Sequence, residues 1–313
     1  MLEALRRFKF SYSLYNFFQK RKLTYNLPLY KKYGLGKRYY SSVSSVDFKG
    51  LDNPKNILDE FDSRDILPKI SAFNNLDTNT RSELLKWSEN GYAILENFYT
   101  SDEVDTFNNE IDALVKSKKA TWKNNGNKIM FAIHKSPLLH SAGSNEKLIS
   151  ILNLLLGKKV DLFQSINFLK GSQQRSHSDS VHMTTFPYGN LIAVWVALED
   201  ITPDCGPLHY YPGSHKLPYT FNEAYDNAGS KYKLGDKPYS AYEDVIEGVI
   251  KANGFQKEVF LPKKGDVLIW HANVLHGGEK VTNPDSSRKS MVFHYYTDDA
   301  VCFHEITQRP TLK

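Results

Sequence analysis

Residues 191–199 read LIAVWVALE, a stretch built from β-branched, aromatic and small apolar residues. These residue types favour β-strands, in which successive side chains point to opposite faces of the sheet. The alternation separates the side chains into two sets: Leu191, Ala193, Trp195 and Ala197 on one face, and Ile192, Val194, Val196 and Leu198 on the other. We therefore predict a β-strand here.

A two-residue period continues through the C-terminal half of the chain. Short runs of β-branched and aromatic residues, separated by Gly, Pro, Asn and Asp, predict strands over 159–169, 174–178, 191–199, 207–211, 257–261, 266–271 and 288–296. Many short strands with such turns are typical of a sandwich or a barrel. We expect a mainly β fold with flanking helices, of the α+β class.

Helical spacing dominates the part of the chain before these strands. We predict a short helix over Thr80–Glu89, a strand over 92–95, a helix capped by Ser101, and a helix over Lys147–Leu156 closed by Gly157. Residues 216–256 interrupt the strand pattern with a helical segment, and we expect an insertion over one mouth of the barrel. The predicted organisation is an N-terminal arm over 1–48 and one domain over 49–313.

Length and composition narrow the class of protein. The chain has 313 residues, of which 41% are hydrophobic and 24% charged, and these values exclude collagen, coiled coils and wholesale disorder. Only two cysteines are present, Cys205 and Cys302, which excludes a disulfide scaffold and suits a reducing compartment such as the cytoplasm. No run of 18 apolar residues occurs, so no transmembrane helix is predicted.

The positive charge is concentrated at the N-terminus. The whole chain carries a net charge of +5, but residues 1–42 hold ten basic residues and one acid, so they sum to +9 and residues 43–313 sum to −4. Apolar and aromatic residues recur there at helical spacing, at Leu2, Leu5, Phe8, Tyr12, Tyr15 and Phe18. Three interpretations remain open: a helix packed on the body, peripheral contact with an anionic membrane, and organelle targeting. Nucleic acid binding is not expected, because no known motif accompanies the charge.

The stretch QRSHSDSVHM, residues 174–183, contains the most informative polar residues. His177 and Asp179 are two apart, so on a strand both side chains would point to the same face. An imidazole and a carboxylate at this spacing can bind one metal ion, and two His with one carboxylate are typical of non-haem Fe(II) oxygenases. Taken alone, such a pair is more often a hydrogen-bonded pair at the surface than a metal site.

Two later segments offer partners for that pair. WHANVLHGGEK, residues 270–280, places His276 directly before two glycines that let the backbone pass close to a ligand. SSRKSMVFHYY, residues 286–296, begins a strand with Arg288, and a hairpin of that length can bring Arg288 beside the metal. A guanidinium there can bind a carboxylate through two hydrogen bonds.

Taken in this order, the segments resemble the phytanoyl-CoA dioxygenase-like branch of the Fe(II)/2-oxoglutarate-dependent oxygenases. The resemblance covers about 86–313 and includes GYAILENFYTSDEV (91–104), HSD (177–179), VWVALEDITPDCGPLHYYPGSHK (194–216), HANVLHGG (271–278) and the downstream Arg. It implies a double-stranded β-helix, also called a jelly roll. It also implies Fe(II), 2-oxoglutarate and O2 as cofactor and cosubstrates.

The resemblance assigns roles to individual residues. The iron ligands fall on His177, Asp179 and His276, and the arginine that binds the far carboxylate of 2-oxoglutarate falls on Arg288. Trp195 and Gln164 are expected beside the cosubstrate, although Trp195 could also be an ordinary core residue. His182, Met183 and Thr184 follow the metal motif and are candidates for contact with substrate. One departure is Gly278, where the family can have Ser, so a hydroxyl contact to the cosubstrate is expected to be missing.

The resemblance implies hydroxylation of an unactivated C–H bond of a small metabolite, with release of succinate and CO2. Asp179 is present where related halogenases have a small residue, so hydroxylation is expected rather than halogenation. Two alternatives remain: the same chemistry on a membrane-borne lipid or lipid-linked sugar, and a non-catalytic jelly-roll binding protein. The complete ligand set with Arg288 argues against the last.

Overall fold

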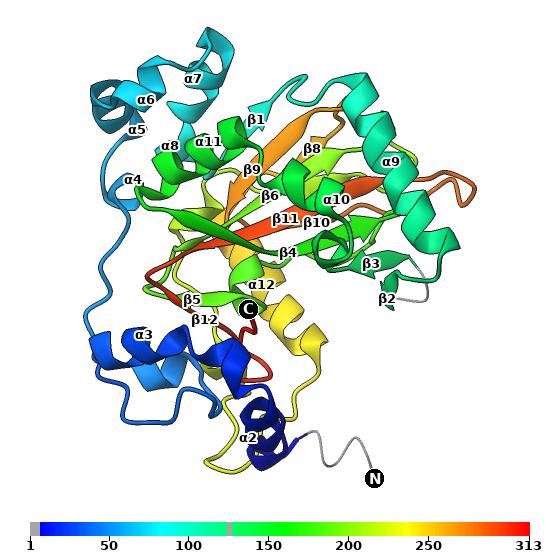
Figure 1. Ribbon diagram of the computed structural model, residues 1–313. Coiled ribbons are helices and arrows are strands. Elements are labelled where there is room, and N and C mark those ends of the chain that lie inside the picture. The colour runs from blue at the N-terminus through cyan, green and yellow to red at the C-terminus, as the bar shows by residue number, and fades with distance from the viewer. Residues whose placement is uncertain (1–6, 124–126) are drawn as a thin grey trace.

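The structure is a computed structural model that describes residues 7–123 and 127–313 (Figure 1). A seven-stranded antiparallel sheet forms its centre, in the order β1-β9-β6-β11-β4-β3-β2. The strands are β1 (Tyr92–Leu95), β2 (Thr121–Lys123), β3 (Lys128–Met130), β4 (Val160–Phe168), β6 (Leu191–Ala197), β9 (Val267–His271) and β11 (Ser290–Thr297).

Two three-stranded sheets complete the β structure. One has the order β10-β7-β8, with β10 (His276–Gly278), β7 (Leu208–Tyr210) and β8 (Glu258–Phe260). The other has the order β13-β12-β5, with β13 (Arg309–Pro310), β12 (Val301–His304) and β5 (Thr184–Phe186). Leu208 and Phe260 of the first small sheet share a buried cluster with Trp195 and Trp270 of the large sheet. The two sheets therefore pack face to face.

Helices cover the opposite face of the large sheet (Figure 1). These helices are α9 (Ser101–Lys116), α10 (Pro137–Gly143) and α11 (Glu146–Leu156), preceded by α4 (Ile57–Glu60), α5 (Ser63–Ile66), α6 (Ser71–Asn74), α7 (Thr78–Leu84) and α8 (Trp87–Asn90). The remaining helices are α2 (Lys9–Phe18), α3 (Asn26–Lys32) and α12 (Tyr239–Asn253). Short 3-10 turns lie at Lys20–Leu23, Ser45–Phe48, Leu67–Lys69, Ala132–His134, Asp179–Val181, Ser214–Lys216 and Asn222–Tyr225.

The alternation in β6 is confirmed. Ile192, Val194 and Val196 belong to the large apolar cluster under the helices. Ala193, Trp195 and Ala197 belong to the cluster between the two sheets. A single strand therefore supplies the core on one face and a wall of the barrel interior on the other.

Local sequence signals set most element boundaries, with small corrections. The helix predicted from Ser101 is α9, but its N-cap is Thr100, because a capping box pairs the Thr100 side chain with the Glu103 amide and the Glu103 carboxylate with the Thr100 amide. The helix α11 ends at Leu156 and is followed by Gly157, whose φ of 64° fits the left-handed C-cap. The segment 80–89 forms parts of α7 and α8 rather than one helix.

One predicted strand is wrong. No strand occupies residues 174–178, where only His177 forms an isolated antiparallel bridge, with His276. After this single bridge the backbone turns into the 3-10 turn that starts at Asp179. The chain is crossing between two sheets here, so extended pairing cannot continue on either side. The other predicted strands are confirmed as β1, β4, β6, β7, β8, β9 and β11, whereas β2, β3, β5, β10, β12 and β13 were not predicted.

The described part of the N-terminal arm packs against the body. Leu29, Tyr30, Val43 and Phe48 share a buried cluster with side chains of β5 and β12. Phe48 stacks on Phe186 with ring centroids 4.3 Å apart. This contact supports the packed-helix interpretation from residue 29 onward, while Leu2 and Leu5 lie outside the described residues. Among the helices described, none combines the length and the apolar character needed to cross a membrane.

The predicted insertion contains α12, which lies beside the open end of the barrel. Its own side chains Tyr242 and Ile246 are buried, and the Tyr242 hydroxyl accepts a hydrogen bond from the Ser178 amide at 3.1 Å. The helix is therefore fixed against the segment that carries His177 and Asp179. The division of the chain into an arm and a single domain stays a prediction.

Candidate active site

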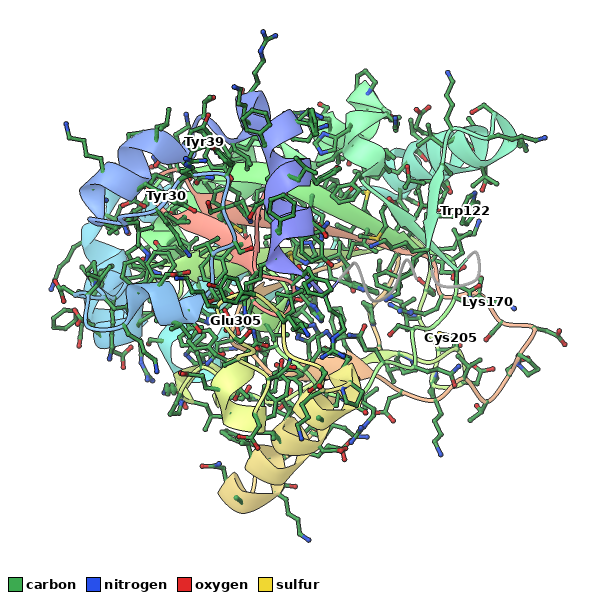
Figure 2. All side chains as sticks on the ribbon, turned by 90° about the horizontal axis from the view of Figure 1, so that it is seen from below. Tyr30, Tyr39, Trp122, Lys170, Cys205 and Glu305 are labelled. Carbon is green, nitrogen blue, oxygen red and sulfur yellow. The ribbon has the colours of Figure 1, made fainter. Side chains whose placement is uncertain are left out.

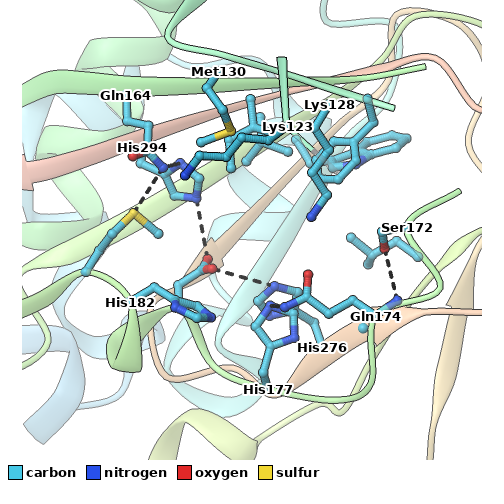
Figure 3. A pocket seen from close by; sticks show the side chains of 18 of the residues that line it. Lys123, Lys128, Met130, Gln164, Ser172, Gln174, His177, His182, His276 and His294 are labelled. Atoms are coloured by element: carbon cyan, nitrogen blue, oxygen red, sulfur yellow. Dashed lines mark hydrogen bonds and ion pairs between the residues drawn. The ribbon is translucent and has the colours of Figure 1, made fainter. Parts of the chain in front are cut away.

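A cavity of about 660 Å³ opens between the large sheet and the small sheet β10-β7-β8. Its walls come from β3, β4, β6, β9 and β11 on one side and from the His177 segment, β10 and α12 on the other (Figure 3). The residues named from the sequence that line it are His177, Asp179, His276, Arg288, Trp195, Gln164, His182 and Met183. Thr184 does not line it, because it is buried in β5 and its hydroxyl donates to the Ser180 carbonyl.

His177, Asp179 and His276 converge at the floor of this cavity. One ligand atom from each lies within 4.8 Å of the others, and all three residues are buried. The His177 amide donates to the His276 carbonyl and the His276 amide donates to the His177 carbonyl, both at 2.9 Å. Convergence therefore results from a two-residue bridge followed by a turn, not from strand alternation as the sequence suggested.

Hydrogen bonds orient both imidazoles. His177 Nδ1 lies 2.9 Å from the Arg175 carbonyl, and His276 Nδ1 lies 3.0 Å from the Val274 carbonyl. A carbonyl can only accept, so each Nδ1 carries a proton and Nε2 is the ring nitrogen left for a ligand. Burial, and the nearby His276, hold the pKa of His177 well below its usual value, so the ring stays neutral. An imidazole whose Nδ1 proton is fixed in this way can present Nε2 to a metal.

The carboxylate of Asp179 is held by Trp270. The indole Nε1 donates to Asp179 Oδ2 at 2.8 Å, while Oδ1 lies 3.8 Å from His276 Nε2. His294 Nε2 lies 3.7 Å from Oδ2. Burial alone would raise the pKa of Asp179, but the neighbouring His276 and His294 keep it well below its usual value. The group is therefore an anion, with Oδ1 free of the indole and available to a cation.

Arg288 supplies a buried positive charge to the same cavity. It is only 3% exposed, its Nη1 donates to Ser290 at 3.1 Å, and its Nε has no hydrogen-bond partner. No carboxylate of the described residues lies within 4 Å of it. Burial lowers the pKa of Arg288 to about 10, so it stays charged at neutral pH. A buried, unpaired guanidinium is costly without an anionic partner, so the site is built to receive one.

The wall beside Arg288 is aromatic. The Arg288 guanidinium lies 4.9 Å from the Phe168 ring centroid and 5.8 Å from that of Trp195. Trp195 Nε1 is buried without a partner, so it is a second free donor in this part of the cavity. The carboxylate and the two imidazoles of the cluster can bind a divalent metal, and these two donors can bind a dicarboxylate beside it.

Gln164, Met183 and His182 form further parts of the wall. The Gln164 amide lies 3.5 Å from both Met183 Sδ and His294 Nδ1. His182 Nε2 lies 2.9 Å from the Tyr239 hydroxyl of α12 (Figure 3). His182 follows the 3-10 turn Asp179–Val181 rather than a strand, and its ring lines the cavity.

Several cavity residues were not predicted. Trp270 lay in a predicted strand, but its contact with Asp179 spans 91 positions and has no local signal. His294 shares a face with Ser290 and Val292, and that spacing could have placed it in the wall. Gln174, whose Nε2 lies 3.2 Å from His177 Nε2, and the lysines of the β2–β3 hairpin, Lys123 and Lys128, carried no recognisable pattern.

Two glycines allow β10 to pass close to its neighbours. A Cβ on Gly277 would lie 2.7 Å from the His209 ring, and one on Gly278 would lie 2.5 Å from Ser172 Oγ. A side chain at 278 therefore has no room. The hydroxyl of Ser172 occupies that space and lines the cavity, so a hydroxyl is present there although residue 278 is glycine.

Comparison with known proteins places this geometry in a family. A family model described as Phytanoyl-CoA dioxygenase (PhyH) matches residues 87–290. "Phytanoyl-CoA dioxygenase domain-containing protein 1" of Danio rerio is 28% identical over 176 residues, covering 54% of this chain and 56% of the relative. "Ectoine dioxygenase" of Stutzerimonas stutzeri (strain A1501) is 26% identical over 247 residues, covering 72% and 80%. The chain thus spans little more than half of the first relative.

Solved structures share the fold. The non-heme alpha ketoglutarate dependent carbocyclase SnoK from nogalamycin biosynthesis matches with a TM-score of 0.58 and 19% identity, covering 73% of this chain and 87% of SnoK. EctD from S. alaskensis, solved with 2-oxoglutarate and 5-hydroxyectoine, matches with a TM-score of 0.53 and 20% identity, covering 71% and 76%. The predicted double-stranded β-helix with flanking helices is confirmed.

Proposed function

The chain belongs to the phytanoyl-CoA dioxygenase family of Fe(II)- and 2-oxoglutarate-dependent oxygenases, and we propose that it hydroxylates a C–H bond of a small metabolite. The reaction would consume O2 and 2-oxoglutarate and yield the alcohol, succinate and CO2. One observation carries the proposal: a single cavity holds both the His177–Asp179–His276 cluster and the buried, unpaired Arg288. Hydroxylation is supported by the likeness to EctD, which was solved with 2-oxoglutarate and 5-hydroxyectoine, whereas SnoK is described as a carbocyclase.

The residues present fit iron and 2-oxoglutarate. His177 and His276 would bind the metal through Nε2, because each Nδ1 is bonded to a backbone carbonyl, and Asp179 would bind it through Oδ1, because Oδ2 accepts from Trp270. Iron(II) with 2-oxoglutarate supplies the oxidising power for C–H hydroxylation when both are bound.

The protein's part is to bind, orient and exclude water. Arg288 would hold the far carboxylate of 2-oxoglutarate, with Trp195 Nε1 as an additional donor. Trp270 keeps Asp179 in one orientation, so that a single carboxylate oxygen faces the cluster. Val292, Phe168 and Leu208 are apolar walls of the cavity, and they reduce the water around the reacting centre.

Turnover without substrate tests the chemistry. Purified protein with Fe(II) should slowly release succinate from 2-oxoglutarate under air, and His177→Ala should abolish this. Arg288→Ala should raise the KM for 2-oxoglutarate by at least about tenfold, since a charge-assisted bond to a buried carboxylate is lost. His134→Ala, at an exposed histidine outside the cavity, is the control. Absence of succinate with the wild-type protein would favour a non-catalytic binding protein, and equal turnover in His177→Ala would show that the His177 cluster does not carry the activity.

A second candidate is the same chemistry on a membrane-borne substrate. It is favoured by an exposed stripe on α2, formed by Phe10, Leu14, Phe17 and Phe18, of which Phe10 and Phe18 are about three-quarters exposed. Lys20, Arg21 and Lys22 follow directly and have no ion-pair partner among the described residues. Aromatic residues next to basic ones suit the surface of an anionic bilayer.

Vesicle sedimentation tests this candidate. The full chain should pellet with phosphatidylserine-containing vesicles and not with phosphatidylcholine alone, and Phe10→Ser with Phe18→Ser should abolish pelleting. Surface substitutions are preferable to deletion of the arm, because Tyr30, Val43 and Phe48 are part of a buried cluster. Equal pelleting of the double variant, or none by the wild type, would exclude membrane docking through α2.

A further inference from the structure

Two lysines face each other across the β2–β3 hairpin at the cavity wall. Lys123 and Lys128 are direct cross-strand partners in the antiparallel register, and both line the cavity. Figure 3 shows their side chains extending into it, across from the histidine cluster. Like charges directly opposite on neighbouring strands repel each other. Within 7–123 and 127–313, no carboxylate lies at ion-pair distance from either ammonium group.

A third cation is close to this pair. Lys128 Nζ lies 4.9 Å from the centroid of the Phe168 ring, which the Arg288 guanidinium also contacts at 4.9 Å. Burial lowers the pKa of Lys128, and Arg288 and Lys123 lower it further. This part of the cavity therefore concentrates positive charge around one aromatic ring.

The known charges of the cavity do not balance the lysines. The negative charge of Asp179 would be neutralised by the metal, and that of the far carboxylate of 2-oxoglutarate by Arg288. The other carboxylate in the wall, Glu243, lies 3.5 Å from Arg175 and is already paired. His182 and His304 add no negative charge, and burial lowers the pKa of His182 to about 3 and of His304 to about 4, so both are neutral.

We infer that the substrate carries an anionic group, a carboxylate or a phosphate, and that Lys123 and Lys128 bind it. This inference rests on the proposed function, which assigns the other charged groups of the cavity. An anion between the two ammonium groups would remove the repulsion across the hairpin. The rest of the substrate would lie against Met130, Met183 and Leu208, between the lysines and the metal cluster.

Calorimetric binding of three probes of equal chain length tests this inference: hexanoate, hexyl phosphate and hexan-1-ol. The protein is the full chain with Mn(II) in place of iron and saturating 2-oxoglutarate, so that Arg288 is occupied. We expect at least one anion to bind about tenfold or more tighter than the alcohol, because charge-assisted hydrogen bonds are formed. Lys123→Met with Lys128→Met should abolish the preference, and Lys116→Met, at an exposed lysine of α9, should leave it unchanged.

The outcomes test the anion site and the proposed 2-oxoglutarate-dependent function separately. Tighter binding of hexanoate or of hexyl phosphate identifies the group. Equal binding of all three probes, no binding of any, or an anion preference retained in the double lysine variant would overturn the inference. A separate titration of 2-oxoglutarate into the Mn(II) protein tests the proposed function. Its failure, with a lysine-dependent anion preference still present, would reject the cosubstrate and keep the anion site.

Discussion

The two faces of the large sheet differ in what they contact, although the same strands build both. On β11, Met291, Phe293 and Tyr295 pack under the helices, whereas Ser290, Val292 and His294 point to the barrel interior. The helix-covered face is closely packed and mostly apolar, and its Tyr295 hydroxyl donates to the Gly143 carbonyl at 2.7 Å. The interior face carries charged and imidazole groups.

A buried cation without an anionic partner makes the difference concrete, because the unpaired Asn167 amide on the helix-covered face is uncharged. The interior face includes Trp195 Nε1 and Arg288 Nε, both buried and unpaired, beside the acidic and imidazole cluster. Leaving such groups unpaired costs stability unless a ligand satisfies them. Adjacent residues of one strand therefore have different roles. One packs in the core and stabilises the fold, and its neighbour faces the cavity and can carry an unsatisfied group that a ligand would bind.

The largest expected effect is on the interior face. Asp179→Ala removes the carboxylate of the cluster, so Mn(II) binding should fall below detection by calorimetry. The thermal unfolding temperature of the metal-free protein should stay the same or rise, since a buried anion is removed. Metal binding as tight as in the wild type would show that the cluster is not the metal site.

Phe293→Ala, on the helix-covered face, should lower the stability and leave ligand binding unchanged, which is the reverse of the result expected for Asp179→Ala. Phe293 is fully buried, and its removal should lower the free energy of unfolding by about 3–5 kcal/mol, measured by urea denaturation. The affinity for 2-oxoglutarate of the folded variant should be unchanged. Val292→Ala, one position away and facing the interior, is the matched comparison and should cost less stability. An equal loss of stability in both variants would break the distinction between the faces.

Trp270→Phe tests a single hydrogen bond on the interior face. The ring is kept but the donor to Asp179 Oδ2 is lost, so Mn(II) affinity should fall about 10–100-fold. Trp87→Phe, at a buried tryptophan under the helices, is the control and should leave Mn(II) affinity unchanged. Equal metal affinity in Trp270→Phe and wild type would show that the indole does not orient the carboxylate.

The smallest effect concerns pH and lies outside the cavity. Burial and the neighbouring His271 lower the pKa of His215 to about 3, against 6.5 in the unfolded chain. Protonation therefore favours unfolding: the contribution of His215 is constant above pH 6.5 and is lost as the pH falls from 6.5 toward 3. The free energy of unfolding should fall by roughly 1 kcal/mol per pH unit on this account.

His215→Gln should make the stability less dependent on pH between 6.5 and 5 in urea denaturation. His134→Ala, at an exposed histidine, should keep the wild-type dependence. An identical pH dependence in His215→Gln would show that this histidine does not remain neutral in the fold.

The sequence allowed a good part of the site to be predicted. The residues His177, Asp179, His276 and Arg288 were named from short motifs, and the structure brings all four into one cavity. The reason for the first pair was wrong, because a bridge and a turn, rather than a strand, direct them together. Their roles as ligands stay a prediction until metal binding is measured.

The sequence by itself determined the alternation of β6, the helical stripes and the motif residues, because these depend on periods of two and 3.6 and on local caps. Only the tertiary structure decided that Trp270 orients Asp179 and that Ser172 fills the space beside Gly278. It also decided that Lys123 and Lys128 lie in the same cavity as Arg288. These contacts join residues at least 91 positions apart in the sequence. Their geometry follows from how the sheets close around the cavity, which no local pattern encodes.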